Sequence, residues 1–447
     1  MLEGPKNIIG LLVQLEEKSR ENPDDVGLMQ RLARLYFKNG AIEDSARIYE
    51  KILKIQPENV PVLVELANCR IRQKEYEEAT FLLERAQEIK PGFYVTFLTF
   101  ARMYEAQKIT DRQISFLMLA ANAAPEKTEI RLALAEQLKK HGDLNGAIEQ
   151  YRNIVRDHPR LEAALFGLGT LLMKKNDLAE AMQSFRTILR INPGAFDAHF
   201  NLANCLFRQK KFKMAIDHFR ISCRRKDLME RSLYLMAQCH FKLKDYDRAI
   251  VAMEKLVSVD EENISYQKCL AEIYEESGEY DLARDIYKFL SRIAPERPEF
   301  MVKHAEMHIA MKDFASAEKA LDMLFRTHPG HLEGHKLLGE IYLAKGHYKA
   351  AVEEFKRTLM INENYADAYL CLAKVYAEIG DIQNECDALK KAVELGVENP
   401  ALLLKLGQIE NKLKLPTSLD RFKRVTELDP ASDCALEAEY YLKHQAA

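Results

Sequence analysis

Residues 29–57 read MQRLARLYFKNGAIEDSARIYEKILKIQP, and the proline that ends this stretch recurs at an interval of 34 residues. After Pro57, the same register position holds proline at Pro91, Pro125, Pro159, Pro193, Pro295 and Pro329. The remaining places are occupied by Asp227, Glu261, Glu363 and Val397. Eleven repeats therefore run from residue 26 to residue 399 without insertion or deletion. Such a period indicates a stack of similar supersecondary units rather than one large core.

Each repeat contains two apolar segments with helical spacing, and small residues mark where they meet. When each repeat is numbered from 1, starting at Val26, position 8 is alanine or glycine in all eleven repeats. Position 20 is alanine in eight repeats, the exceptions being Ser45, Gln113 and Glu385, and position 24 is large throughout. Small residues let two helices approach closely. Glycine at position 15, as in Gly40, predicts a turn that ends the first helix, and proline at position 32 ends the second.

This pattern resembles the tetratricopeptide repeat (TPR) family. The resemblance implies an all-α fold, a right-handed superhelical α-solenoid of about 12 helix-turn-helix repeats of 34 residues. The chain departs from the family pattern at position 4, because it contains no Trp. It also departs at Gln113 and Glu385, and at the missing prolines after repeats six, seven, ten and eleven, where we expect locally altered packing.

The register also predicts the domain organisation. Residues 1–25 are predicted to form an amino-terminal capping helix, with the helix itself over 5–21, because Pro5 suits a first helical position. Residues 400–431 resemble a degenerate twelfth repeat, and residues 432–447 are predicted to form a carboxy-terminal capping helix. The eleven repeats between them span 26–59, 60–93, 94–127, 128–161, 162–195, 196–229, 230–263, 264–297, 298–331, 332–365 and 366–399.

Charge and cysteine content narrow the classes of partner and compartment. The formal net charge is −3, so we expect no nucleic-acid partner. Residues 1–250 hold 40 basic and 33 acidic residues, whereas residues 251–447 hold 25 basic and 35 acidic residues. The first part is therefore net positive and the second net negative, and the two present different electrostatic fields to a partner. The eight cysteines include no Cys-x-x-Cys pair, which is typical of free thiols in a reducing compartment. No apolar run reaches 18 residues, so we expect a cytoplasmic protein without membrane insertion.

Catalytic motifs are absent from the sequence, which contains no Gly-rich phosphate loop and no Gly-x-Ser-x-Gly elbow. We therefore expect no catalytic residues and no cofactor. Six of the twelve histidines lie within residues 304–347, and His304 and His308 share a helix face at a spacing that metal ligands can use. Because these two occupy core-type positions 7 and 11, packed imidazoles are the preferred interpretation, and metal binding is the alternative.

In TPR proteins the first helices line the concave surface, so the resemblance implies that positions 2, 5, 6, 9, 12 and 13 face a groove. In repeats five to seven these positions combine aromatic rings, amides and cations, which favours an extended acidic peptide. The predicted peptide-binding residues are Phe166, Lys174, Phe200, Asn201, Asn204, Phe207, Arg208, Tyr234, Gln238, Phe241 and Lys242. The alternative is structural: the aromatic rings pack against neighbouring helices and the cations only provide solubility.

Repeats eight to ten place glutamates on the corresponding face. The predicted acidic groove consists of Glu272, Glu275, Glu276, Glu306 and Glu340. A basic protein segment, or the basic half of another copy of the chain, would complement this charge.

Together these features predict a non-enzymatic scaffold or adaptor that binds partner proteins or extended peptides in its groove. One alternative is a regulatory or substrate-selecting subunit of an enzyme complex whose catalytic domain lies on another chain. A second alternative is a self-assembling structural solenoid that joins basic to acidic halves.

Overall fold

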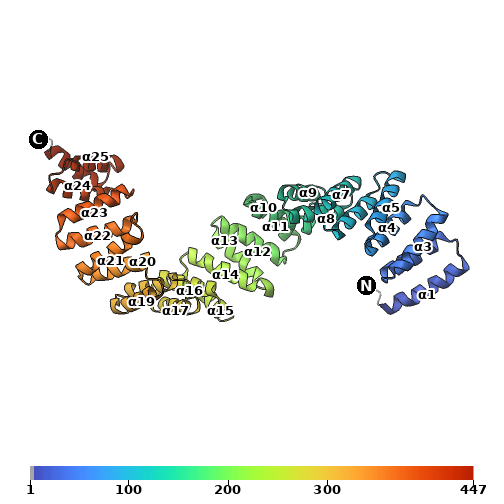
Figure 1. The fold of residues 1–447 in the computed structure, drawn as a ribbon, viewed down its shortest axis with the longest axis horizontal. Helices are drawn as coiled ribbons and strands as arrows, with labels where there is room; N and C mark the ends of the chain where they lie inside the picture. Colours follow the sequence, from blue (N-terminus) through green and yellow to red (C-terminus); the bar gives the residue numbers. More distant parts are fainter. Residues whose placement is uncertain (1–4, 446–447) are drawn as a thin grey trace. The chain divides into compact units, whose positions relative to one another are not determined.

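The computed structural model describes residues 5–445, and this range contains 26 α-helices and no β-strand. The chain divides at Leu228 into two compact units, unit 1 (Met1–Leu228) and unit 2 (Met229–Ala447). Within each unit, successive helices form antiparallel hairpins that stack side by side (Figure 1). The predicted all-α repeat fold is confirmed.

Unit 1 begins with α1 (Pro5–Glu21), the helix expected over 5–21. The first helices of its repeats are α2 (Val26–Lys38), α4 (Val60–Gln73), α6 (Tyr94–Ala106), α8 (Thr128–His141), α10 (Glu162–Lys174) and α12 (Phe196–Arg208). The second helices are α3 (Ile42–Ile55), α5 (Tyr76–Ile89), α7 (Thr110–Ala123), α9 (Leu144–Asp157), α11 (Leu178–Ile191) and α13 (Phe212–Ser222).

Unit 2 has the same alternation, and its first helix, α14 (Lys226–Lys242), begins just before the unit boundary. The other first helices are α16 (Ile264–Ser277), α18 (Glu299–Ala310), α20 (Leu332–Ala344), α22 (Ala366–Ile379) and α24 (Pro400–Lys412). The second helices are α15 (Tyr246–Val257), α17 (Tyr280–Ile293), α19 (Phe314–Thr327), α21 (Tyr348–Ile361), α23 (Ile382–Glu394) and α25 (Ser418–Leu428), and α26 (Asp433–Gln445) follows them.

Close packing within a repeat depends on the small residue at position 8. A Cβ atom added to Gly169 would lie 2.8 Å from the ring of Phe185, and one added to Gly339 would lie 2.6 Å from the ring of Phe355. Both phenylalanines are fully buried at position 24 of the same repeat. Each ring therefore packs directly on the backbone of the first helix, which leaves no room for a larger side chain.

The turn between the two helices has a left-handed residue at position 15 in all twelve repeats, including those that lack glycine there. Glycine occupies this place in Gly40, Gly142, Gly278, Gly346 and Gly380, whereas Lys74, Lys108, Asn176, Lys210, Lys244, Lys312 and Lys414 adopt it with φ between 55° and 67°. This conformation costs a residue with a side chain roughly 1–2 kcal/mol. Helix packing therefore imposes the turn even where the local sequence does not favour it.

The repeats without a closing proline differ from one another. Second helices that precede a proline at position 32 have 14 residues, as α11 does. In contrast, α13 has 11, α15 has 12 and α23 has 13, while α21 keeps 14. The second helix is thus shorter in repeats six, seven and eleven but not in repeat ten.

Candidate protein-binding surfaces of the two units

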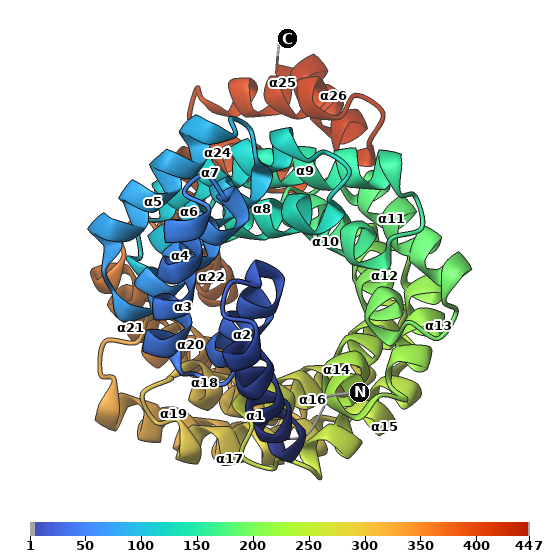
Figure 2. The same ribbon diagram turned by 90° about the vertical axis from the view of Figure 1, so that its right-hand side faces the viewer.

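The first helices of unit 1 form its inner row. In Figure 2, α8, α10 and α12 lie on the inner side, and α9, α11 and α13 lie outside them. Side chains that leave these first helices on the side away from the second helices therefore line the inner side of unit 1.

The aromatic residues predicted for repeats five and six contribute mainly to hairpin packing. Phe200 is only 5% exposed, and its ring packs edge-on against Phe219 with the centroids 5.9 Å apart. Phe166 is half-buried and makes the same contact with Phe185 at 6.0 Å. The prediction that Phe200 is an exposed contact residue is therefore wrong, because its ring fills the space between α12 and α13.

The two asparagines on α12 differ in how much of their hydrogen-bonding capacity is already used. The Asn201 amide donates to the backbone carbonyl of Asp197 at 3.0 Å. Asn204 is half-buried and forms no side-chain hydrogen bond with the described part of the chain. One helical turn further on, the half-buried ring of Phe207 packs against Phe212 at 5.6 Å. Asn204 is thus the amide that can pair with a partner.

The cation at the end of α12 reaches the backbone at the end of α10, where a second cation stands. The Arg208 guanidinium donates through Nη1 to the carbonyl oxygen of Met173 at 3.0 Å, next to Lys174 in the chain. Both cations are exposed, and neither forms an ion pair with a residue in 5–445. We call Lys174, Asn204 and Arg208 the basic site of unit 1.

The remaining predicted peptide-binding residues lie on α14, in unit 2. Tyr234 packs against Tyr266 with ring centroids 5.7 Å apart, and burial raises the pKa of its hydroxyl. Half-buried Gln238 lies one turn further along the same helix. The Lys242 ammonium lies 5.4 Å from the ring centroid of Phe241, which is a cation–π distance. The sequence-predicted groove residues thus fall into two sets, one in each unit.

The acidic groove predicted for unit 2 is largely neutralised by lysine. Lys303 Nζ lies 2.8 Å from Glu275 and 2.9 Å from Glu306, and the Tyr287 hydroxyl donates to Glu275 at 2.9 Å. Burial by itself lowers the pKa of Lys303, but its bonds to the two carboxylates outweigh this and raise it above the ordinary value. Two of the predicted glutamates therefore already hold a cation.

The other predicted glutamates are paired less closely. Lys268 lies 3.7 Å from Glu272, and Lys336 lies 3.7 Å from Glu340. Burial raises the pKa of Glu340 above its ordinary value. Glu276 is exposed and has no ion-pair partner in the described range. The face is less acidic than its glutamate count indicates.

The two histidines singled out in repeat nine lie in the core. His304 is 6% exposed, its ring centroid lies 4.9 Å from that of His308, and burial lowers its pKa to about 4. His308 Nδ1 lies 3.4 Å from the carboxylate of Asp313. Within residues 5–445, no three or more His, Cys, Asp or Glu side chains gather in a metal-binding arrangement. The geometry is that of packed imidazoles.

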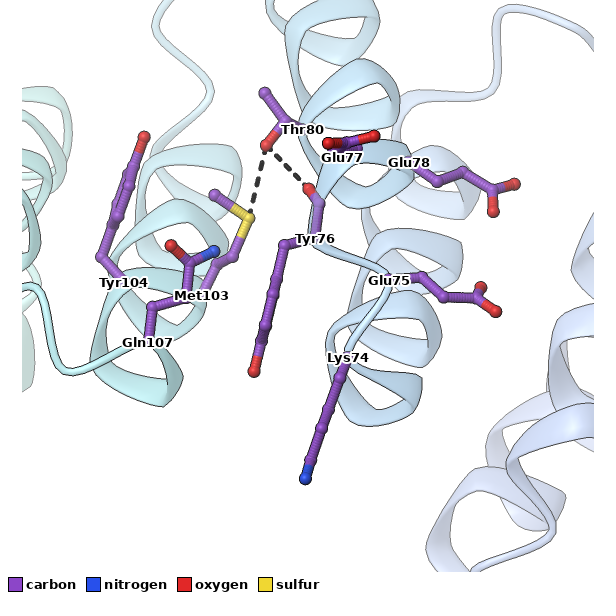
Figure 3. Close-up of a pocket in the computed structure, with 9 residues that line it drawn as sticks. All are labelled: Lys74, Glu75, Tyr76, Glu77, Glu78, Thr80, Met103, Tyr104 and Gln107. Atoms are coloured by element: carbon purple, nitrogen blue, oxygen red, sulfur yellow. Dashed lines mark hydrogen bonds between the residues drawn. The ribbon is translucent and has the colours of Figure 1, made fainter.

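A hollow of about 680 Å³ lies at the turn between α4 and α5 (Figure 3). Tyr76 and Tyr104 line it, and Thr80 Oγ1 donates to the Tyr76 carbonyl at 2.9 Å. The acidic residues beside it, Glu75 and Glu78, both pair with Arg70 at 3.0 Å. The polar groups of Glu75, Glu78 and Thr80 in this hollow thus already have partners within the protein.

Models of several helical-repeat families match the sequence. Tetratricopeptide repeat models match residues 40–95, 132–196 and 274–341, a TPR repeat model matches 339–380, and the model for anaphase-promoting complex, cyclosome, subunit 3 matches 174–256. The chain belongs to the tetratricopeptide repeat family. This confirms the family that its 34-residue period indicated.

Individual relatives of this TPR chain are distant. Lipopolysaccharide assembly protein B of Escherichia coli K12 is 23% identical over 170 residues, which are 37% of this chain and 44% of that protein. The chain thus matches less than half the length of this relative. Among solved structures, the match to Naa15/Naa10 bound to HypK-THB covers 89% of this chain and 67% of the matched chain. The sequence identity is 16% and the TM-score is 0.46. The match to yeast Tom70 covers 93% of this chain and 94% of the Tom70 chain, with 15% identity and a TM-score of 0.41.

Polar side chains at position 4 of this TPR array link alternate repeats to the repeat before them. In repeats four, six, eight and ten, a side-chain N–H at position 4 donates to the backbone carbonyl at position 32 of the preceding repeat. The pairs are Arg131 with Pro125, His199 with Pro193 at 3.0 Å, Gln267 with Glu261 at 2.8 Å and His335 with Pro329 at 2.9 Å. Position 4 of the intervening repeats holds Phe97, Leu165, Leu233, Met301 and Tyr369. This is how the array bridges adjacent repeats without tryptophan.

TPR arrays are protein-interaction scaffolds, and membership of this family makes the chain a protein-interaction scaffold. None of its helices in residues 5–445 has the length and apolar character needed to cross a bilayer.

Proposed function

We propose that this chain is a non-enzymatic scaffold whose unit 1 holds an extended acidic segment of a partner protein at the basic site. One observation supports the proposal: Lys174 and Arg208 are exposed without ion-pair partners in residues 5–445, and the Arg208 guanidinium bonds to the carbonyl of Met173, the residue before Lys174. The guanidinium of Arg208, which this bond already restrains, loses little conformational freedom when it binds a carboxylate.

Asn204 supplies the second kind of contact. An amide offers both a donor and an acceptor, so it can pair with the main chain of an extended peptide whatever its side chains are. The cations would then select acidic side chains or a terminal carboxylate. Phe200 takes no direct part, because it is buried beneath the site.

The proposal is tested with a fluorescein-labelled peptide of alternating Asp and Ser, titrated by fluorescence anisotropy at low and high salt. The double variant Lys174→Glu with Arg208→Glu should weaken binding by at least tenfold, since each reversed charge repels the peptide. Binding of the wild-type protein should weaken as salt screens the charges.

The matched control reverses two exposed cations on the second helices of the same repeats, Arg186→Glu with Lys213→Glu. Both double variants change the net charge equally. If the two weaken binding to the same extent, the peptide senses only the overall charge and the basic site is not its binding site.

A further inference from the structure

Position 20 departs from alanine in three repeats, and the structure gives each polar side chain a different environment. The Ser45 hydroxyl donates to the carbonyl of Ala33 at 2.8 Å. The Glu385 carboxylate lies 2.7 Å from Lys405 Nζ. Gln113, on α7, is 7% exposed, and its side chain forms no hydrogen bond with any residue of the described chain. Gln113 is therefore a largely buried residue whose amide keeps some access to solvent and has no hydrogen-bond partner within residues 5–445.

This amide lines a cavity of about 330 Å³ bounded by α6, α7 and α8 of unit 1. Its apolar walls come from Leu98, Leu117 and Ile130. A second amide, that of Gln137 on α8, also lines the cavity and forms no hydrogen bond within residues 5–445. The cavity thus combines apolar walls with two amides whose donors and acceptors are unused.

The amide atoms of Gln113 are not fully enclosed, so they can hydrogen-bond to water or to a ligand in the cavity. Packing does not require it, since eight other repeats place alanine at this position. Three residues of repeat three line the cavity: Leu98 at position 5, Arg102 at position 9 and Glu105 at position 12. Arg102 and Glu105 are exposed. The family resemblance assigns these positions to the groove, where a bound peptide would pass.

We propose that this cavity, the Gln113 pocket, receives one side chain of the partner peptide, with an apolar stem and a neutral tip that both donates and accepts hydrogen bonds. Glutamine and tyrosine have this chemistry. The lining also holds the charged side chains of Arg102, Glu105 and Glu129. The inference rests on the proposed function, because it assigns a second contact point to the same partner segment.

The test uses four uncharged probes: N-acetyltyrosinamide, N-acetylglutaminamide, N-acetylphenylalaninamide and N-acetylleucinamide. Each is titrated into the full chain while the methyl resonances of Leu98, Leu117 and Ile130 are followed by NMR. The tyrosine or the glutamine probe should bind about fivefold more tightly than its tipless counterpart, which is the worth of one hydrogen bond. The probe that shows this preference, tyrosine or glutamine, identifies the partner side chain that the pocket receives.

The variant Gln113→Ala should abolish this preference while keeping the residue that most repeats use. Gln137→Leu serves as a second variant if the first fails to fold. The inference is overturned if no probe shifts these methyl resonances, as for a pocket that holds only water, or if the tyrosine and glutamine probes bind no better than their counterparts. Because the probes carry no charge, the result is independent of the acidic-peptide titration.

Discussion

Repeats five and six of unit 1 and repeats eight to ten of unit 2 carry charge on equivalent helix faces, yet they use it differently. In unit 1, Lys174 and Arg208 have no ion-pair partner among the described residues 5–445. In unit 2, Lys303 sits between Glu275 and Glu306. Positions 5 and 6 differ between these repeats: they hold no cation in repeats five and six, whereas each of repeats eight to ten has one lysine there, Lys268, Lys303 or Lys336. The charge available to a partner therefore depends on pairing and not on the count of charged residues.

The largest expected effect concerns the support beneath the basic site. Phe200→Ala should lower the free energy of unfolding by about 3–5 kcal/mol, because it leaves a cavity between α12 and α13. Phe166→Ala, which truncates a half-buried ring, should cost clearly less. Urea denaturation with hydrogen exchange on α12 and α13 measures both. If the two variants lose the same free energy of unfolding, the buried Phe200 ring and the half-buried Phe166 ring do not differ in their contribution to packing.

Acid should destabilise repeat nine of unit 2. Burial lowers the pKa of His304 to about 4 from an ordinary value of 6.5. As the pH falls below 6.5, the unfolded chain therefore binds a proton that the folded chain does not, and stability declines until about pH 4. A difference of 2.5 pKa units corresponds to roughly 3 kcal/mol. Hydrogen exchange on α18 and α19 should accelerate over this range.

The matched variant for this effect is His304→Leu, since leucine is common at position 7 in other repeats. It should remove most of the pH dependence on α18 without affecting α12. Burial also lowers the pKa of His308, so part of the dependence should remain. An unchanged pH profile in His304→Leu would assign the effect to another group.

Removing a paired cation should have a moderate effect. Lys303→Met leaves Glu275 and Glu306 without their shared partner and should cost about 1 kcal/mol, as for a partly exposed ion pair. Lys174→Met in unit 1 should change stability by less than about 0.5 kcal/mol, because no ion pair is lost. A labelled oligolysine peptide should bind the Lys303→Met variant more tightly than the wild type. If it does not, lysine pairing is not what neutralises this face.

The smallest expected effect compares two polar residues at position 20. Ser45→Ala loses the hydrogen bond to Ala33 and should cost about 1 kcal/mol. Gln113→Ala loses no hydrogen bond, so its free energy of unfolding should change less than that of Ser45→Ala. Thermal unfolding of both variants gives the comparison, and a larger loss at Gln113 would show that its side chain is needed for packing.

The candidate sites were only partly predictable from the sequence. The register placed Lys174, Asn204 and Arg208 on one face, and these remain together in unit 1. It also placed Phe200 there, because periodicity cannot tell a ring that turns towards the second helix from one that faces the groove. Gln113 was visible as a departure from alanine, but its cavity depends on how α6, α7 and α8 pack.

The sequence by itself determined the helical hairpins, their 34-residue register and the close contacts at positions 8 and 24, because these follow from local periodicity and side-chain size. Only the tertiary structure decided which side chains are buried, which charges are paired and where polar groups at position 4 bridge adjacent repeats. These properties depend on neighbours about 30 residues away, whose distances and orientations are set by packing between helices.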